Sequence, residues 1–237
     1  MRAGVVIQAR MGSTRLPGKV LERVGRWTIL EHCVRRLRTG GDYPIIVATS
    51  TAPGDTAIEE AARAMGTHVF RGDETDVLAR YRGAARAFAL THVVRATADN
   101  PFVDGDGVHR TLQFLARVGA DHVVECGLPV GAAVEAVTVD ALDRAAALVV
   151  DPYDREHVTS FIRRDGRFKA LRAVAPGAIR RPGLRLTVDT PDDLEFVRHV
   201  YGDLGTPETI VPLTAVIAAA DARIVRGMVQ KRIRQGA

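Results

Sequence analysis

The sequence predicts a single doubly wound α/β domain, and two observations indicate this fold class. Short apolar runs alternate with segments whose apolar residues recur at helical spacing, along nearly the whole chain. The 237 residues, 46% of them hydrophobic, are enough for one large core, and no long linker or fixed-period repeat divides them. We therefore expect a Rossmann-like sheet with helices on both faces.

The first half of the chain carries the clearest strand and helix signals. Residues 2–8 form an apolar run that is typical of a buried parallel strand. A helix is expected at 27–39, where Thr28 and Glu31 are spaced to form a capping box. By the same criteria we expect strands at 43–48, 68–70 and 92–97, and helices at 55–65, 76–89 and about 106–117.

The second half is less regular, and its elements are placed more coarsely. Strands are expected near 121–125, 131–139, 168–174 and 185–188, and helices at about 140–150, 154–164 and 191–201. We assign residues 1–222 to the domain and 223–237 to a basic C-terminal tail, because this tail holds five Lys or Arg residues and no acid.

Charge and cysteine content restrict the possible partners and location. The net charge is +5, which equals the charge of the tail, so the rest of the chain is neutral on balance and nucleic-acid binding is not expected. Cys33 and Cys126 are the only cysteines, no secretory pattern follows Met1, and no apolar run approaches the roughly 20 residues of a membrane helix. We expect a cytoplasmic protein without a membrane partner.

The loop after the first strand, QARMGSTRLPGK at residues 8–19, has the composition of a polyphosphate site. It combines fixed cations with small hydroxyl and glycine residues, namely Arg10, Gly12, Ser13, Arg15, Gly18 and Lys19. It is not a Walker loop, because five residues separate the two glycines and Val20 stands where Ser or Thr is required, and it lacks G-x-G-x-x-G. A basic surface loop without a ligand is the alternative.

Two aspartates are expected on the same edge of the sheet as this loop. Asp99 follows the strand at 92–97, and Asp189 follows the strand at 185–188, just before a helix that Thr190 can cap. Two carboxylates beside a triphosphate are a donor set that suits magnesium (Mg2+). The alternatives are a turn residue at position 99 and an accessory cap at position 189.

Two further residues, Glu135 and His157, stand out in the second half. Glu135 lies in an otherwise apolar strand, where an unpaired acid is costly, so it either pairs with an arginine or faces a site. His157 is either a ligand contact or a hydrogen-bonded helix residue.

Five motifs in this order resemble one family. QARMGSTRLPGKVL, ATSTAPGDTAI, FRGDETDVLARY, REHVT and LTVDTPDDLEFV are similar to segments of the cytidylyltransferases of the spore-coat polysaccharide biosynthesis type. These are related to the 3-deoxy-manno-octulosonate and acylneuraminate cytidylyltransferases, and the likeness covers residues 2 to about 200. The resemblance implies a mixed, mainly parallel sheet of the nucleotide-diphospho-sugar transferase type, CTP as donor, magnesium as cofactor and a homodimer.

The resemblance also assigns roles to individual residues. It implies nucleotide binding by Ala9, Arg10, Gly12, Ser13, Arg15, Lys19, Arg71, Gly72, Asp76, Val77, Arg80 and Asp99. Within this set Arg15, Lys19 and Asp99 are the implied catalytic residues. Asp99 and Asp189 would bind the metal, and Glu135 and His157 would lie in the acceptor pocket. The chain departs from the family pattern at Ala98, Val130 and Ser160.

The expected reaction is the magnesium-dependent transfer of CMP from CTP to an oxygen of a small anionic acceptor, with release of pyrophosphate. A sugar acid, a sugar phosphate or a phosphonate would each offer such an oxygen. Two alternatives remain open at this point: a glycosyltransferase that consumes a nucleotide sugar and releases a nucleoside diphosphate, and a non-catalytic module that only binds a nucleotide.

Overall fold

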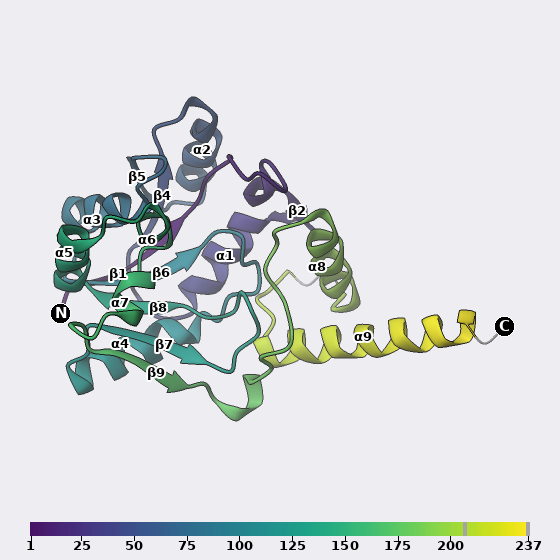
Figure 1. Ribbon diagram of the computed structural model, residues 1–237. Helices are drawn as coiled ribbons and strands as arrows, with labels where there is room; N and C mark the ends of the chain where they lie inside the picture. The colour runs from purple at the N-terminus through teal and green to yellow at the C-terminus, as the bar shows by residue number, and fades with distance from the viewer. Residues whose placement is uncertain (206–207, 236–237) are drawn as a thin grey trace.

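A seven-stranded sheet forms the centre of the computed structural model, which describes residues 1–205 and 208–235 (Figure 1). Its strands run in the order β5-β4-β1-β6-β8-β7-β9. β8 is antiparallel to both of its neighbours, and all other neighbouring pairs are parallel. The expectation of a mixed, mainly parallel sheet is confirmed. The strands are β1 (Ala3–Gln8), β4 (Ile45–Ser50), β5 (His68–Gly72), β6 (His92–Thr97), β7 (His122–Cys126), β8 (Glu135–Thr138) and β9 (Ala170–Val174).

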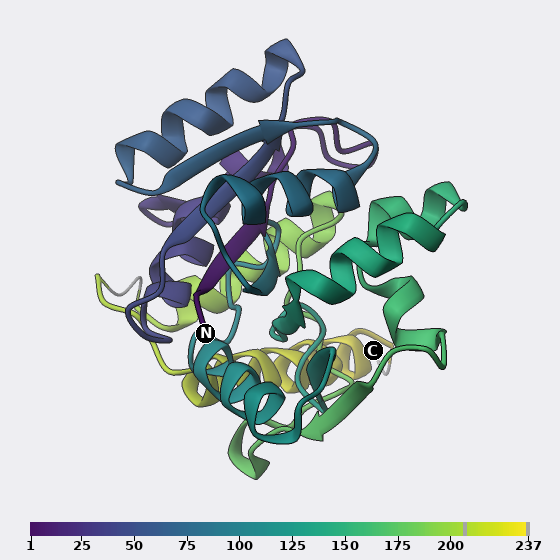
Figure 2. The same cartoon turned by 90° about the vertical axis from the view of Figure 1, so that its left-hand side faces the viewer.

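Helices cover both faces of this sheet because its central strands are apolar on both sides. In β1, Val5 and Ile7 pack into one hydrophobic cluster and Val6 into the other. The first cluster includes α1 (Ile29–Arg38), α2 (Thr56–Ala64) and α4 (Asp106–Val118). The second includes α3 (Val77–Ala87), α5 (Val139–Leu148) and α7 (Ser160–Arg164). On this second face α3 lies beside α5 and the short α6 (Pro152–His157) (Figure 2).

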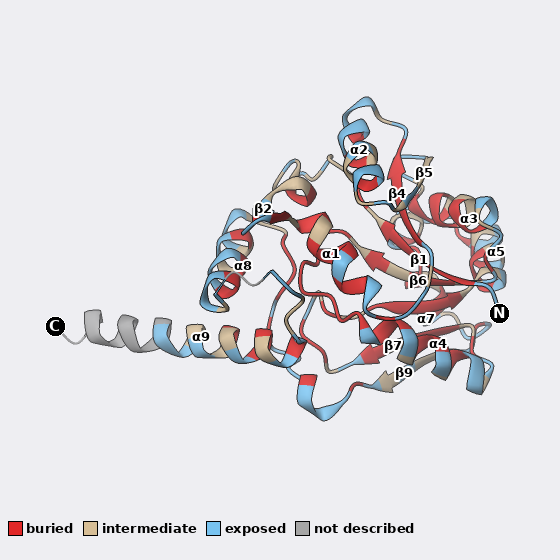
Figure 3. Ribbon diagram, turned by 180° about the vertical axis from the view of Figure 1, so that it is seen from behind, coloured by how far each residue is buried: buried red, intermediate tan, exposed pale blue. Residues whose placement is uncertain are grey.

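A third hydrophobic cluster is separate from the clusters on the two faces of the sheet. It joins the small hairpin of β2 (Arg23–Val24) and β3 (Trp27–Thr28) to α8 (Pro191–Asp203) and α9 (Leu213–Gln235). Figure 1 shows α9 extending away from the sheet, and Figure 3 shows central strands such as β1 and β4 buried while the outer sides of the helices are exposed. The boundary placed at residue 222 falls inside α9, and residues 236–237 of the tail lie outside the described part of the chain.

Most helix starts follow from local hydrogen bonding. The capping box of Thr28 and Glu31 is present at the start of α1, and Thr190 and Asp193 form a second one before α8. Short 3-10 turns connect other elements: η1 (Lys19–Leu21), η2 (Pro53–Asp55) and η3 (Gly177–Ile179). Among the described helices, none is both long and apolar enough to cross a membrane.

Three expected elements differ from those observed. The helix expected at 154–164 is broken into α6 and α7, because Val158 adopts φ 54°, which is outside the helical region. The strand expected at 131–139 is confined to β8. Residues 185–188 do not join the sheet; Arg185 makes an isolated bridge to Val130, and Val188 donates its amide proton to the carbonyl of Asp99 at 2.9 Å.

Candidate active site

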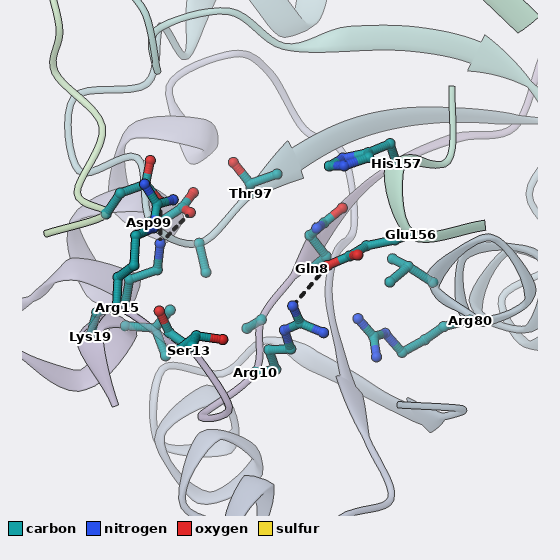
Figure 4. Close-up of a pocket in the computed structure, with 16 residues that line it drawn as sticks. Gln8, Arg10, Ser13, Arg15, Lys19, Arg80, Thr97, Asp99, Glu156 and His157 are labelled. Carbon is teal, nitrogen blue, oxygen red and sulfur yellow. Dashed lines mark hydrogen bonds and ion pairs between the residues drawn. The ribbon is translucent and has the colours of Figure 1, made fainter. Parts of the chain in front are cut away.

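A polar pocket of about 290 Å³ opens at the carboxyl ends of β1 and β6 (Figure 4). This is the edge at which ligands bind in doubly wound sheets. The walls come from the loop after β1, the end of β6, α3, α6 and the segment before α8. The structure brings together here many of the residues expected at the site, namely Ala9, Arg10, Ser13, Arg15, Lys19, Val77, Arg80, Asp99, His157 and Asp189.

The loop after β1 is held in shape by a buried carboxylate beneath it. Asp55 accepts hydrogen bonds from the backbone amide of Met11 at 2.7 Å and from the amide and hydroxyl of Ser50 at 3.1 and 2.6 Å. Burial opposes ionisation of Asp55, but these hydrogen bonds outweigh it and hold its pKa below the ordinary value. Gly18 ends the loop at φ 72°, a conformation that favours glycine, and donates its amide proton to Met11.

Lys19 is the central cation of the pocket. Its residue is only 8% exposed, and Nζ donates to Asp99 Oδ2 at 2.8 Å, Asp189 Oδ1 at 2.9 Å and the carbonyl of Val188 at 2.8 Å. All three of its protons therefore have acceptors. Because both carboxylates bond to the same atom, they lie close enough to share one cation.

Asp189 is surrounded by cations. Its Oδ1 also lies 3.0 Å from Nη2 of Arg15, and its Oδ2 accepts from Nη2 of Arg185 at 2.5 Å. Burial opposes ionisation of Asp189, but the hydrogen bond and charge of Lys19, together with Arg185 and Arg15, keep its pKa below the ordinary value. Arg185 is itself held by Asp193, with Nε 2.9 Å from Oδ1. This chain of contacts fixes the position of the Asp189 carboxylate.

Arg80 is a buried cation that faces the pocket without a carboxylate partner among the described residues. Its residue is 2% exposed, Nη1 donates to the carbonyl of Asp73 at 2.8 Å, and Nε has no hydrogen-bond partner. Burial lowers the pKa of Arg80. A buried guanidinium without a compensating anion is costly, so this position is suited to an anionic ligand.

The opposite wall is built by the end of α6. Arg155 in this helix donates to Asp76 Oδ2 at 2.7 Å, which ties α6 to the start of α3. Glu156 and His157 follow and both line the pocket. The Glu156 carboxylate accepts from Arg10 at 2.8 Å, and the His157 ring lies 4.1 Å from the ring of Tyr153, measured between centroids.

Four residues expected to bind the nucleotide do not line the pocket: Gly12, Arg71, Gly72 and Asp76. Arg71 instead bonds to the carbonyls of Ser50 and Ala52 and to Glu59, which ties β5 to α2. Asp76 caps α3 through the amide of Ala79. Asp76 thereby supports two wall elements, α3 and α6, whereas the contacts of Arg71 lie outside the pocket.

Glu135 also lies away from the pocket, and its carboxylate is fully engaged inside the protein. Oε1 accepts from Arg95 Nη1 at 2.7 Å, and Oε2 bonds to His122 Nε2 at 2.7 Å and to the hydroxyl of Thr159 at 2.6 Å. Burial opposes ionisation of Glu135, but Arg95 and His122 outweigh it, and its pKa stays well below the ordinary value. Of the two roles considered for Glu135, the contacts match pairing with an arginine.

The three departures from the family pattern differ in their distance from the pocket. Ala98 lines it. Val130 is 49% exposed and is not part of the lining. Ser160 is buried, and its hydroxyl donates to Asp154 Oδ1 at 2.6 Å. This hydrogen bond links α7 to α6, which carries part of the pocket wall.

The donor set at Asp99 and Asp189 fits a hard divalent cation that completes its shell with other ligands. Both residues offer carboxylate oxygens, and Lys19 shows that one cation is already shared between them. Within the described residues, no group of three or more His, Cys, Asp or Glu side chains is placed to hold a metal ion. Any ion bound here therefore needs oxygen ligands from water or a phosphate.

Several pocket residues were not named individually as candidates from the sequence. Gln8, Thr97 and Glu156 line the pocket, and Arg185 and Asp55 position its walls. Gln8 and Thr97 are the last residues of β1 and β6, so the rule that ligands lie beyond the strand ends was a signal for them. Glu156 directly precedes His157, and its adjacency to that candidate was the available signal.

Comparison with known proteins identifies a family for this chain. The cytidylyltransferase family profile matches residues 4–211. The spore coat polysaccharide biosynthesis protein SpsF of Bacillus subtilis (strain 168) is 35% identical over 207 residues, which cover 84% of this chain and 86% of that protein. A solved cytidylyltransferase from Leptospira borgpetersenii superposes with a TM-score of 0.87 at 28% identity, covering 95% of this chain and 96% of the other.

A more distant structure shares the fold. It is CMP:2-keto-3-deoxy-manno-octonic acid synthetase in complex with CTP, which has a TM-score of 0.67 at 20% identity over 86% of this chain and all of the other. The family of this chain follows from the profile match over residues 4–211 and from the similarity to SpsF over 84% of the chain. The chain belongs to the cytidylyltransferase family and is a nucleotidyltransferase.

Proposed function

We propose that this protein transfers CMP from CTP to an oxygen of a small anionic acceptor and releases pyrophosphate, with magnesium as cofactor. The observation that carries this proposal is the presence in one pocket of four cations, Arg10, Arg15, Lys19 and Arg80, together with the carboxylates of Asp99 and Asp189. CTP as donor agrees with the family and with the CTP complex of the structurally similar synthetase.

The charges of the pocket match those of the donor. A nucleoside triphosphate brings about four negative charges, and transfer of its nucleotidyl group requires positioning and electrostatic stabilisation rather than a covalent intermediate on the protein. Arg80 lacks a carboxylate partner among the described residues, so it has a free charge for a phosphate. Arg15 and Lys19 exchange their carboxylate partners for phosphate oxygens when the triphosphate enters, which leaves Asp99 and Asp189 available.

Asp99 and Asp189 are the residues that would hold magnesium. When bound, the ion supplies Lewis-acid stabilisation of the phosphate oxygens. Arg185 and Asp193 keep Asp189 in place, and the carbonyl of Val188 holds Lys19 beside both carboxylates. These contacts preorganise the site before any ligand arrives.

The reaction is a single in-line displacement. The acceptor oxygen forms a bond to the α-phosphorus while the bond from that phosphorus to the bridging oxygen of the β-phosphate breaks, and pyrophosphate leaves. A proton on an acceptor hydroxyl passes to solvent or to a basic side chain of the pocket. Arg15 and Lys19 neutralise the charge that grows on the α-phosphate and the leaving group.

A pyrophosphate-release assay tests the proposal. It should cross four nucleoside triphosphates with a nonulosonic acid, another sugar acid, a sugar phosphate and a small phosphonate, in the presence of magnesium. We expect release with CTP and at least one acceptor. Release of a nucleoside diphosphate from a nucleotide sugar would instead indicate a glycosyltransferase. CTP binding without turnover on any acceptor would indicate a non-catalytic module.

A cytoplasmic location and a homodimer stay predictions, and sedimentation of the purified protein tests the homodimer.

Asp99→Asn tests the catalytic role of Asp99. This substitution keeps the shape of the side chain but removes the charge that pairs with Lys19 and would hold the metal. We expect turnover to fall at least about a hundredfold at saturating CTP and magnesium. Near-normal turnover would remove Asp99 from the metal site.

A further inference from the structure

The two carboxylates that would hold the metal have different surroundings. Asp99 uses Oδ2 for its contact with Lys19, and its other oxygen accepts no hydrogen bond from the described residues (Figure 4). Both oxygens of Asp189 are occupied, because Oδ1 faces Lys19 and Arg15 while Oδ2 accepts from Arg185 at 2.5 Å. The partner of Oδ2 therefore decides how many oxygens Asp189 can offer to a ligand.

The three cations around Asp189 differ in whether a nucleotide can draw them away. Lys19 and Arg15 line the pocket, so the phosphates of a nucleotide can reach both of them. Arg185 is not part of the lining. Entry of a nucleotide thus frees Oδ1 of Asp189 but leaves Oδ2 bonded to its arginine.

Arg185 is held in place by contacts that need no ligand. Its Nε lies 2.9 Å from Oδ1 of Asp193, and its Nη2 lies 3.3 Å from Oδ2. The Asp193 carboxylate is itself fixed at the start of α8, where Oδ2 accepts from the amides of Asp189 and Thr190 at 2.9 and 3.0 Å. The backbone on both sides of Arg185 is hydrogen-bonded to Val130. One anchored guanidinium therefore spans two carboxylates.

Coordination through one carboxylate oxygen suits a small ion better than a large one. Magnesium requires a nearly ideal octahedron at short distances, and two oxygens of the same carboxylate lie too close together to fit it well. Calcium takes about six to eight oxygens at longer distances and often binds both oxygens of one carboxylate. An arginine that keeps Oδ2 of Asp189 removes this second mode.

We propose that Arg185 sets the ion preference of the site: it restricts Asp189 to coordination through Oδ1 and so favours magnesium over calcium. The inference rests on the proposed function, because it concerns the metal that Asp99 and Asp189 would hold. Arg185 acts through Asp189 and is a positioning residue. Magnesium and calcium carry the same charge, so loss of the arginine charge alone changes both affinities by a similar factor. Only a freed oxygen changes their ratio.

Calorimetric titration of the intact protein with CTP, in magnesium, in calcium and in chelator, measures this preference without an acceptor. The quantity compared is the factor by which each ion lowers the CTP dissociation constant. In Arg185→Met the calcium factor should rise roughly tenfold relative to the magnesium factor, at the lower end of the effects seen when a group behind a metal ligand is lost. Arg185→Gln cannot bridge two carboxylates either, so the ratio should move in the same direction.

Arg198→Met is the matched control. The side chain of Arg198 is 45% exposed, against 44% for Arg185, and it also pairs with a carboxylate, that of Glu22. It lies on α8 but is not part of the pocket lining. This variant should leave both factors unchanged.

Terbium luminescence reports the coordination itself. Terbium is close to calcium in size, and its emission lifetimes in H2O and D2O give the number of bound waters. With CTP present, terbium in Arg185→Met should keep about one water fewer than in the wild type, because the freed Oδ2 replaces it.

Equal changes in the magnesium and calcium factors, an unchanged ratio, or equal water numbers would overturn the proposal, since Arg185 would then act only through its charge or on the fold. If the wild-type protein did not bind CTP, or if neither ion strengthened that binding, the proposed function itself would be contradicted instead.

Discussion

Glu135→Gln tests whether the buried Glu135 carboxylate stabilises the fold rather than binding the acceptor. The substitution keeps the shape of the side chain but removes its charge, so Arg95, whose side chain is only 14% exposed, is left without a counter-charge. Removing one partner of a buried ion pair typically costs about 3–5 kcal/mol, and the hydrogen bonds from His122 and Thr159 to Oε2 are weakened as well. We expect the free energy of unfolding to fall by about this amount at pH 7.

Urea unfolding at several pH values measures this loss. The pKa of Glu135 is depressed in the folded protein, so its ionised form contributes stability above the ordinary glutamate pKa of about 4.3 and loses it as the pH falls below that value. The difference between wild type and variant should be complete near pH 7 and shrink below about pH 4. The urea midpoint should shift with little change in slope.

Asp143→Asn is the control for this experiment. Asp143 also pairs with two arginines, Arg82 and Arg86, but its side chain is 39% exposed, so its loss should cost less than about 1 kcal/mol. A loss below about 1 kcal/mol for Glu135→Gln would refute the structural role. Unchanged stability combined with a raised acceptor KM would return Glu135 to the acceptor pocket.

Two further predictions concern the charged groups of the pocket. Arg80→Met removes a buried cation that has no carboxylate partner among the described residues, so the free energy of unfolding should be maintained or improved. The CTP dissociation constant should rise about tenfold or more, because a cation that faces the phosphates is lost. Thermal unfolding measures the first effect and calorimetry the second, and unchanged CTP affinity would contradict the role of Arg80. Asp99→Asn should retain CTP binding in the absence of magnesium but lose the additional CTP affinity that magnesium gives the wild-type protein. If magnesium raised the CTP affinity of both proteins equally, metal binding by Asp99 would be contradicted.

The sequence predicted the parts of the site that depend on strand order. Asp99 meets Lys19 because β1 and β6 end at the same edge of the sheet. Asp189 reaches them for a different reason than the expected one, because residues 185–188 form no strand of the sheet and the amide of Val188 instead donates to the carbonyl of Asp99. The alternation of apolar runs and amphipathic helices was sufficient for the fold class. It was also sufficient to place the basic loop after β1 at that edge.

Other features depend on pairing between distant segments, which a local pattern does not contain. Glu135 in β8 lies directly opposite Arg95 in β6, and only the antiparallel register of these strands turns a candidate acceptor residue into an internal ion pair. Val158 interrupts an otherwise regular helical pattern because its burial and the bond from Thr159 to Glu135 override local propensity.

The proposed reaction takes place at the α-phosphorus of CTP, and tracing labelled phosphorus tests this most directly. In parallel reactions with CTP labelled at the α- or the γ-phosphate, an active acceptor and magnesium, the α-label should appear in the acceptor product and the γ-label in pyrophosphate. Transfer of the γ-label to the acceptor, or release of the α-label only as free CMP, would contradict nucleotidyl transfer.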